Sequence, residues 1–199
     1  MKTFEGMSDE TLALLYVKGD NRAFDELLNR TQTKLFTYIM FVVRDHDMAD
    51  DIFQETFVKV ITKLQQGQYT DSGKFQFWLT RIAHNVIMDW YRQQQSRHIV
   101  DFGPENDLQN LSSDTVLDTH IESEMINEQV LLDVKRIMEA LPAPQREVVY
   151  MRYYQQMSFK EIADITGVSI NTSLGRMRYA LINMRRMAKK HSIELALEI

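Results

Sequence analysis

The sequence contains no cysteine, and it has only 7 glycines and 3 prolines in 199 residues. Without cysteine the chain can form no disulfide framework, no thiolate metal site and no thiol switch. Glycine and proline punctuate loops and hairpins, so their scarcity predicts long helices with few tight turns. No run of about 18 apolar residues occurs, and no secretory signal pattern is found. We therefore expect an all-α, cytoplasmic protein without membrane insertion.

Charge is distributed unevenly along the chain. Residues 98–128 hold eight acidic residues and no Lys or Arg, whereas residues 129–199 hold 11 basic and 7 acidic residues. The acidic segment also contains Gly103, Pro104 and several Asn and Ser residues, which favour open chain over helix. We interpret 98–128 as an acidic flexible linker between two small helical domains, 1–97 and 129–199. An ordinary solvated loop is the alternative.

Residues 8–95 have the pattern of three or four helices. Ser8 is predicted to cap the first, Gly19–Asp20 to end it and cap the second, and Asp47 to cap the third. In the third helix one face is apolar and is predicted to be buried: Phe53, Phe57, Val60 and Leu64. Asp51 and Glu55 point the opposite way, with Gln54 on the flank. The helix dipole gives acidic residues in a first turn a purely structural explanation as well.

The segment 74–95 combines aromatic and basic residues. Its predicted core stripe consists of Phe75, Leu79, Ile82 and Val86. A second side carries Trp78, Arg81, Asn85 and Arg92. Aromatic and cationic side chains together can stack unpaired bases and hold the strand electrostatically. Packing of Trp78 or Tyr91 against a neighbouring helix is an equally good interpretation from spacing alone.

The C-terminal segment has the pattern of a helix-turn-helix. Proline residues in 141–144 interrupt the preceding helix, and the next helix is predicted to keep Val148, Val149, Met151 and Tyr153 or Tyr154 near one side. Ser158 and Glu161 have the spacing of a capping box for a short helix. Gly167 then serves as a left-handed stop, and Ser169 as the N-cap of a long basic helix. The second helix of such a motif lies in the major groove.

A helical wheel divides this basic helix into two faces. The predicted buried stripe is Ile170, Leu174, Met177, Leu181 and Met184. The predicted outward face is Thr172, Arg176, Tyr179, Asn183, Arg186 and Lys190. Arg176 can donate two hydrogen bonds to guanine. Thr172 and Asn183 can either read base edges or position the helix on the DNA. A basic face that is merely solvated is the alternative.

Three segments in this order resemble bacterial extracytoplasmic-function sigma factors of the sigma-70 family. They are residues 50–57, residues 77–85 with Asp89 and Arg92, and residues 141–186. The resemblance implies a transcription initiation factor that docks on the clamp helices and the flap of core RNA polymerase and binds promoter DNA. In the first segment it implies that the clamp helices are contacted by Asp51, Gln54 and Glu55.

The resemblance also implies two promoter contacts. Melting and holding of the −10 element is expected from Trp78, Arg81, His84, Asn85 and Arg92. Reading of the −35 element is expected from Asn171, Thr172, Gly175, Arg176 and Tyr179. An anti-sigma factor is an expected partner, the acidic linker is expected near the RNA path, and the active protein is expected at the nucleoid.

Two other classes of protein fit the sequence less well. A helix-turn-helix regulator acting without polymerase would need a ligand or phosphoacceptor domain, and the N-terminal half shows only a helical bundle. A helical enzyme would need a site, but the five histidines lack metal-ligand spacing and no glycine-rich phosphate loop occurs. We therefore expect no catalytic residue, no metal and no cofactor.

Overall fold

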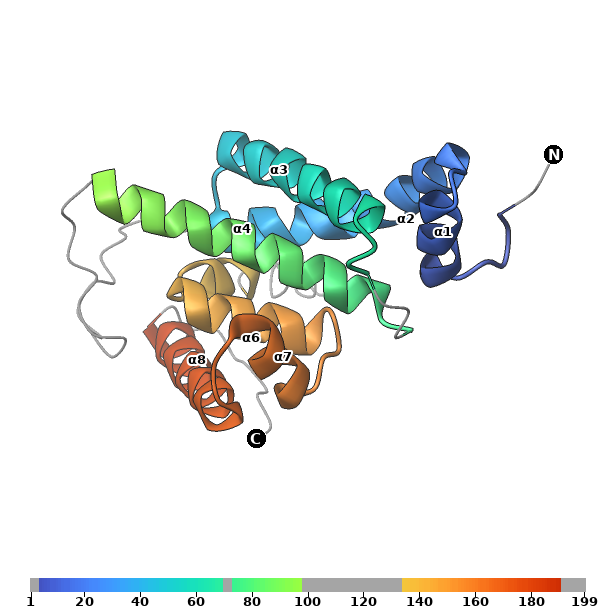
Figure 1. Ribbon diagram of the computed structural model, residues 1–199. Coiled ribbons are helices and arrows are strands. Elements are labelled where there is room, and N and C mark those ends of the chain that lie inside the picture. Colours follow the sequence, from blue (N-terminus) through green and yellow to red (C-terminus); the bar gives the residue numbers. More distant parts are fainter. Residues whose placement is uncertain (1–3, 70–72, 98–133, 191–199) are drawn as a thin grey trace, which may run out of the picture.

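The computed structural model describes residues 4–69, 73–97 and 134–190 (Figure 1). Within these ranges every regular element is a helix and no strand occurs, which confirms the all-α prediction. The predicted acidic linker 98–128 lies outside the described residues.

Four helices form the N-terminal domain: α1 (Asp9–Val17), α2 (Asn21–Val43), α3 (His46–Gln65) and α4 (Phe75–Arg97). Ser8 caps α1 as predicted, because its hydroxyl accepts a hydrogen bond from the Thr11 amide. Asp20 occupies the N-cap position of α2 but makes no side-chain capping bond.

The predicted cap of α3 was wrong. Asp45 has extended backbone geometry and accepts from the Met48 amide at 3.0 Å, whereas Asp47 lies inside the first turn. The connection from α2 is only Arg44 and Asp45, because Arg44 takes the left-handed conformation that ends α2. The helix therefore begins earlier than the sequence suggested.

The core of the N-terminal domain is large and aliphatic or aromatic. In α4 the predicted stripe of Phe75, Leu79, Ile82 and Val86 is fully buried. In α3, Phe57, Val60 and Leu64 are buried and Phe53 packs partly buried against them. These stripes were predicted correctly because exposing large apolar side chains along one side of a helix to water is unfavourable, so that side is buried.

A helical turn at residues 134–139 precedes α6 (Ala143–Tyr153), α7 (Phe159–Thr166) and α8 (Ile170–Lys190). Pro144 lies in the first turn of α6, where its missing amide hydrogen costs no helical bond. Val148, Val149 and Met151 are buried. Tyr153 and Tyr154 are about 60% exposed, because α6 ends there, and Tyr150 is the tyrosine that turns inward.

The two sets of helices pack against each other, α2 on α6 and α4 on α7 (Figure 1). Their apolar residues form one continuous cluster. At the junction the Tyr150 ring lies 5.0 Å from Phe41 and 5.6 Å from Tyr38, centroid to centroid. Burial and the nearby Tyr154 raise the pKa of Tyr150 to about 12, so its phenol stays protonated at neutral pH.

Candidate nucleic-acid interface

The outer face of α3 is polar and open. Asp51, Gln54 and Glu55 are all exposed, as predicted. Val58 lies one turn further along the same face and is 62% exposed. An acidic face with one exposed apolar side chain suits a protein partner better than DNA, since its carboxylates are repelled by phosphates.

A chain of surface charges joins α3 to α4. Lys59 lies 2.8 Å from the Glu55 carboxylate and 3.7 Å from that of Asp89. Asp89 in turn accepts a hydrogen bond of 2.5 Å from Arg92. These groups are solvent-exposed enough that each pair contributes little to stability. Their consequence is that one nitrogen of the Arg92 guanidinium is held by a carboxylate in the free chain, while the side chain stays largely exposed to solvent.

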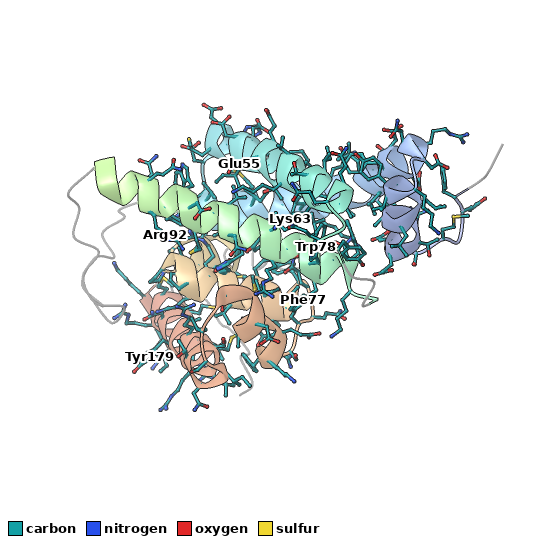
Figure 2. All side chains as sticks on the ribbon, viewed as in Figure 1. Glu55, Lys63, Phe77, Trp78, Arg92 and Tyr179 are labelled. Atoms are coloured by element: carbon teal, nitrogen blue, oxygen red, sulfur yellow. The ribbon has the colours of Figure 1, made fainter. Side chains whose placement is uncertain are left out.

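The other predicted −10 contacts on α4 divide into two groups. Arg81 and Asn85 are exposed and available. Trp78 is half-buried, with its ring 4.9 Å from Tyr69 and 5.6 Å from Phe75 (Figure 2). Trp78 therefore presents one part of its ring to solvent while its neighbours fix the ring plane. Tyr91 packs inward and donates to the Val42 carbonyl, so for this residue the packing interpretation was right.

His84 lies in the contact between the two domains. Its ring nitrogen Nδ1 is 2.7 Å from Oε1 of Glu147, on α6, and both side chains are buried. Tyr38 of α2 donates to the same Glu147 oxygen at 2.5 Å. In this packed arrangement His84 therefore faces Glu147, and a promoter strand could reach it only after the domains part. Its role at the −10 element stays a prediction.

Two further polar groups, those of Arg146 and Tyr38, are buried near Glu147 at the contact between the domains. Arg146 donates to the Val42 carbonyl across the domain contact, at 2.6 Å, and to two carbonyls of its own domain. Burial, and secondarily the Glu147 carboxylate, raise the pKa of Tyr38 well above its ordinary value. A buried carboxylate with these partners is stable only while they are present, because an unpartnered buried charge is strongly unfavourable.

The helix-turn-helix is built as the sequence predicted. Ser158 and Glu161 form both halves of the capping box at the start of α7. Gly167 ends α7 with a φ of 68°, a left-handed geometry that glycine adopts without strain. Ser169 caps α8, since its hydroxyl accepts from the Thr172 amide at 3.0 Å. These three local signals set the angle at which α8 leaves α7.

The predicted faces of α8 are partly wrong. Ile170 and Leu174, expected in the core, are 46% and 44% exposed. Asn183, expected on the outer face, is buried and donates to Gln145 of α6 at 2.8 Å. The buried face is rotated by about 60° around the helix axis relative to the prediction, and Met177 and Met184 belong to both faces. The face packed on α6 and α7 consists of Ser173, Met177, Ala180, Asn183, Met184 and Ala188.

The five residues predicted to read the −35 element differ in their exposure to solvent. Asn171 and Tyr179 are exposed, and Tyr179 projects away from the domain in Figure 2. Gly175 is on the same outward side, and a methyl group added there would meet nothing within 4 Å. Thr172 is half-buried beside Ser169, and Arg176 is half-buried as well.

Sequence reasoning missed Leu174 and Arg178 on the outer face, and it missed Glu147 altogether. The signal for the first two was available: Ser173 and Ala180 are small enough for a close helix contact, so a stripe through them could have been the buried one. Glu147 offered no such signal, since its partners Tyr38 and His84 lie more than 60 residues away along the chain.

Within the described ranges, no group of three or more His, Asp or Glu residues is placed to hold a metal ion. In the same ranges, the helices are all too short or too polar to cross a membrane.

Two family models match the chain. The model of sigma-70 region 2 matches residues 27–97, and that of sigma-70 region 4 matches residues 131–174. A helix-turn-helix domain packed on a four-helix domain thus has its counterpart in two regions of one class of transcription factor, and the chain belongs to the sigma-70 family of RNA polymerase sigma factors. Within that family it is of the extracytoplasmic-function type.

Relatives and solved structures agree with this assignment. The chain is 28% identical to the ECF RNA polymerase sigma-E factor of Escherichia coli over 175 residues, which are 87% of this chain and 90% of that protein. It is 26% identical to the RNA polymerase sigma-H factor of Pseudomonas aeruginosa over 179 residues, 85% and 88% of the two chains.

Two solved structures share the fold. RpoE in complex with the anti-sigma factor NepR from Bartonella quintana has a TM-score of 0.61 and 22% identity, covering 83% of this chain and 96% of that one. CnrH in complex with the cytosolic domain of CnrY also has a TM-score of 0.61, with 23% identity and coverages of 92% and 97%.

Proposed function

We propose that this chain directs core RNA polymerase to specific promoters, with one task assigned to each exposed helix. The α3 face of Asp51, Gln54 and Glu55 docks on the clamp helices of the largest polymerase subunit. Helix α4 opens and holds the −10 element, and α8 reads the −35 element as duplex. The polymerase supplies the catalysis, so the chain needs no active site or cofactor, and it works in the cytoplasm where the nucleoid lies.

The observation that carries this proposal is the combination of two outward faces of opposite character on separate domains. The α3 face is acidic and partly apolar, while α8 holds six Lys and Arg residues and no acidic residue between 170 and 190. A protein surface and a DNA surface on one chain are what a subunit needs if it is to bring an enzyme to DNA. The boundaries 1–97, 98–128 and 129–199 are the division of labour we propose.

The packed arrangement of the domains cannot be the one that works at a promoter. Positions −10 and −35 are about 25 base pairs apart, which is about 85 Å of duplex at about 3.4 Å per base pair. A compact chain of this length has a radius of gyration of about 16 Å, hence a diameter of about 40 Å. We therefore take the contact of α2 and α4 with α6 and α7 as a resting state, which polymerase binding must separate.

Separation has a local energetic consequence at Glu147. Opening the contact removes Tyr38 and His84 from its carboxylate and returns all three groups to water. Because water replaces each lost hydrogen bond, opening a complete set of partners is far less unfavourable than deleting one partner from the closed state. The contact can therefore hold the free chain closed and still yield to a larger interface on polymerase.

A partner that holds the resting state is also expected. The RpoE and CnrH structures contain these relatives in complex with an anti-sigma factor and with the cytosolic domain of CnrY. We propose that an anti-sigma protein binds this chain in the packed arrangement, where one binding partner can touch both domains at once.

The test is run-off transcription by purified core polymerase on a pool of random promoters, with and without this chain. The expected result is that the chain enriches promoters sharing two sequence elements at a fixed spacing. Enrichment of one element alone, or no dependence on the chain, would refute the proposal.

Variants on the two faces make the test specific. Asp51→Ala with Glu55→Ala should abolish enrichment by weakening polymerase binding, measured by co-sedimentation with core. Asp25→Ala with Asp164→Ala is the matched control, since both carboxylates are exposed but lie on α2 and α7, away from this face. Equal losses in the two double variants would show that net charge, not the α3 face, decides docking.

A further inference from the structure

The outer face of α8 changes character along its length. Its first half exposes Ile170, Asn171, Leu174, Arg178 and Tyr179, so that two aliphatic side chains, an amide and a phenol ring accompany a single exposed cation. Its second half exposes Ile182 and three cations, Arg186, Lys189 and Lys190. In a helix-turn-helix the N-terminal residues of the second helix meet base edges, while distal cations suit phosphates. The half that meets bases is therefore the less charged half.

We propose that Asn171 and Leu174 read adjacent A·T base pairs of the −35 element, with Leu174 packing on a thymine methyl group and Asn171 hydrogen-bonding an adenine. This assignment rests on the proposed function of α8 and deepens it. In this assignment Leu174 and Arg178 face the groove, and Arg176 does not. The bases selected by the first half of α8 are thymine and adenine.

The exposure of Leu174 is the first argument. A leucine that is 44% exposed on a capped, well-packed helix leaves apolar surface in water that the core could not use, because Ser173 and Met177 occupy the buried side. The thymine methyl is the one apolar group that base edges present in the major groove. Leu174 on a thymine therefore removes apolar surface from both partners.

The position of Asn171 is the second argument. Asn171 and Leu174 are three residues apart, so their Cβ atoms are about 5–6 Å from each other on one side of the helix. That separation is compatible with contacts to successive base pairs, which are about 3.4 Å apart along the duplex. An asparagine amide pairs with adenine at N6 and N7, and no other base edge matches it as well.

Hydrogen bonds at the start of α8 hold Thr172, the neighbour of Asn171, against the helix cap. The Thr172 hydroxyl lies 2.9 Å from that of Ser169, whose oxygen also caps the helix. Pulling Thr172 outward would therefore disturb the cap of α8. Gly175, by contrast, opens the outer side between Leu174 and Arg178, since no atom lies within 4 Å of an added methyl. The backbone can approach a groove closely there.

A protein partner is the other occupant that an exposed apolar face could have. Charge favours DNA, because α8 carries six cations and no acidic residue from 170 to 190. Duplex DNA presents two phosphate charges per base pair to such a helix.

The test uses the full chain bound to core polymerase and a promoter selected from the random pool. Each thymine of the −35 element is replaced in turn by deoxyuridine, which removes only the 5-methyl group. At one position this should weaken wild-type binding about fourfold, the factor that burial of one methyl group supplies. Leu174→Ala should bind less tightly and no longer distinguish thymine from uracil there.

Ile182→Ala is the matched control, because Ile182 is 46% exposed on the same helix but two turns beyond Leu174. It should keep the wild-type response to deoxyuridine. Replacing the adenine beside that thymine with 7-deazaadenine should weaken the wild type and leave Asn171→Ala unaffected.

Each other outcome overturns the assignment in a distinct way. If wild type depends on the −35 element but no thymine is sensitive to uracil, Leu174 does not read a methyl group, and the proposed function stands. If Leu174→Ala lowers polymerase binding itself, the face belongs to a protein partner. If wild type shows no −35 dependence, the proposed function fails together with this inference.

Discussion

Helices α4 and α8 carry the two DNA contacts we propose, yet they build their buried faces from opposite kinds of residue. In α4 the buried stripe is large, with Phe75 and Leu79 each 1% exposed. In α8 it is small or flexible, with Ser173 and Ala180 each 0% exposed between methionines. Large residues fill a gap between helices, whereas small ones let helices approach closely. The two domains should therefore fail under opposite substitutions.

The largest effect is expected in α4. Leu79→Ala removes a fully buried side chain and leaves a cavity, so the free energy of unfolding should fall by about 3 kcal/mol. Urea denaturation followed by circular dichroism measures it. A loss as small as that of the half-exposed Leu174→Ala would mean that α4 is not the rigid core helix described above.

The reverse substitution should damage α8. Ala180→Leu forces an added side chain into the contact with α6 and α7, and should lower the free energy of unfolding by about 2 kcal/mol. Leu174→Ala on the opposite side should change it by less than about 0.5 kcal/mol, because that position is half-exposed. If the two variants exchange these effects, the buried and outer faces of α8 have been assigned the wrong way round.

This contrast also explains how far the sequence could go. Capping residues such as Ser158 and Gly167 act within a few residues of themselves, so the helix ends they form were predictable. A stripe of large apolar residues such as Phe75 to Val86 is stable only when buried, so its burial was predictable too. The face of α8 was not, because a wheel that weights residues by hydrophobicity favours Ile170 and Leu174 over Ser173 and Ala180. A small residue is needed there because α6 packs closely on α8. The sequence of α8 alone gives no information about that packing.

The candidate sites divide in the same way. The exposure of Asp51, Gln54 and Glu55 follows from their position on one helix, so it could be predicted without tertiary information. The burial of His84 by Glu147 depends on how two domains pack, and no local pattern announces it. Trp78 lies between these cases, since its spacing allowed both packing and exposure, and the structure gives it some of each.

Gly175 offers a smaller effect with opposite signs on stability and binding. Gly175→Ala should raise the free energy of unfolding by about 1 kcal/mol, because glycine is a poor helix former and no atom obstructs the added methyl. The same methyl should weaken −35-dependent binding by standing between the backbone and the groove. Urea denaturation and run-off transcription measure the two. Unchanged −35 dependence would show that the outer backbone of α8 stays away from DNA.

The smallest effect should come from Glu161, which caps α7 and pairs with Lys74 of the other domain at 2.7 Å. The hydrogen bond from Lys74, and then those from Ser158, lower the pKa of Glu161 from 4.5 to about 2. Since the folded pKa is depressed, this stabilisation is present above about pH 4.5 and is lost as pH falls toward 2. Glu161→Gln should destabilise by about 0.5–1 kcal/mol at pH 7.

The pH dependence separates charge from capping. The difference between wild type and Glu161→Gln, from urea titrations at pH 3 to 7, should shrink on the acid side. Lys74→Gln should reproduce part of the effect, because it removes the first of the two causes. A difference that does not change with pH would assign the role of Glu161 to helix capping alone.

The central claim is that two domains, each with its own DNA-binding surface, pack against each other in the free chain and must move apart to work. Because the chain has no cysteine, single cysteines at the exposed positions Lys34 and Lys189 can carry spin labels without interference. Double electron-electron resonance then measures the separation of α2 and α8. We expect one short distance in the free chain and an increase of roughly 40 Å in the active promoter complex. An unchanged distance in a complex that transcribes would contradict the account.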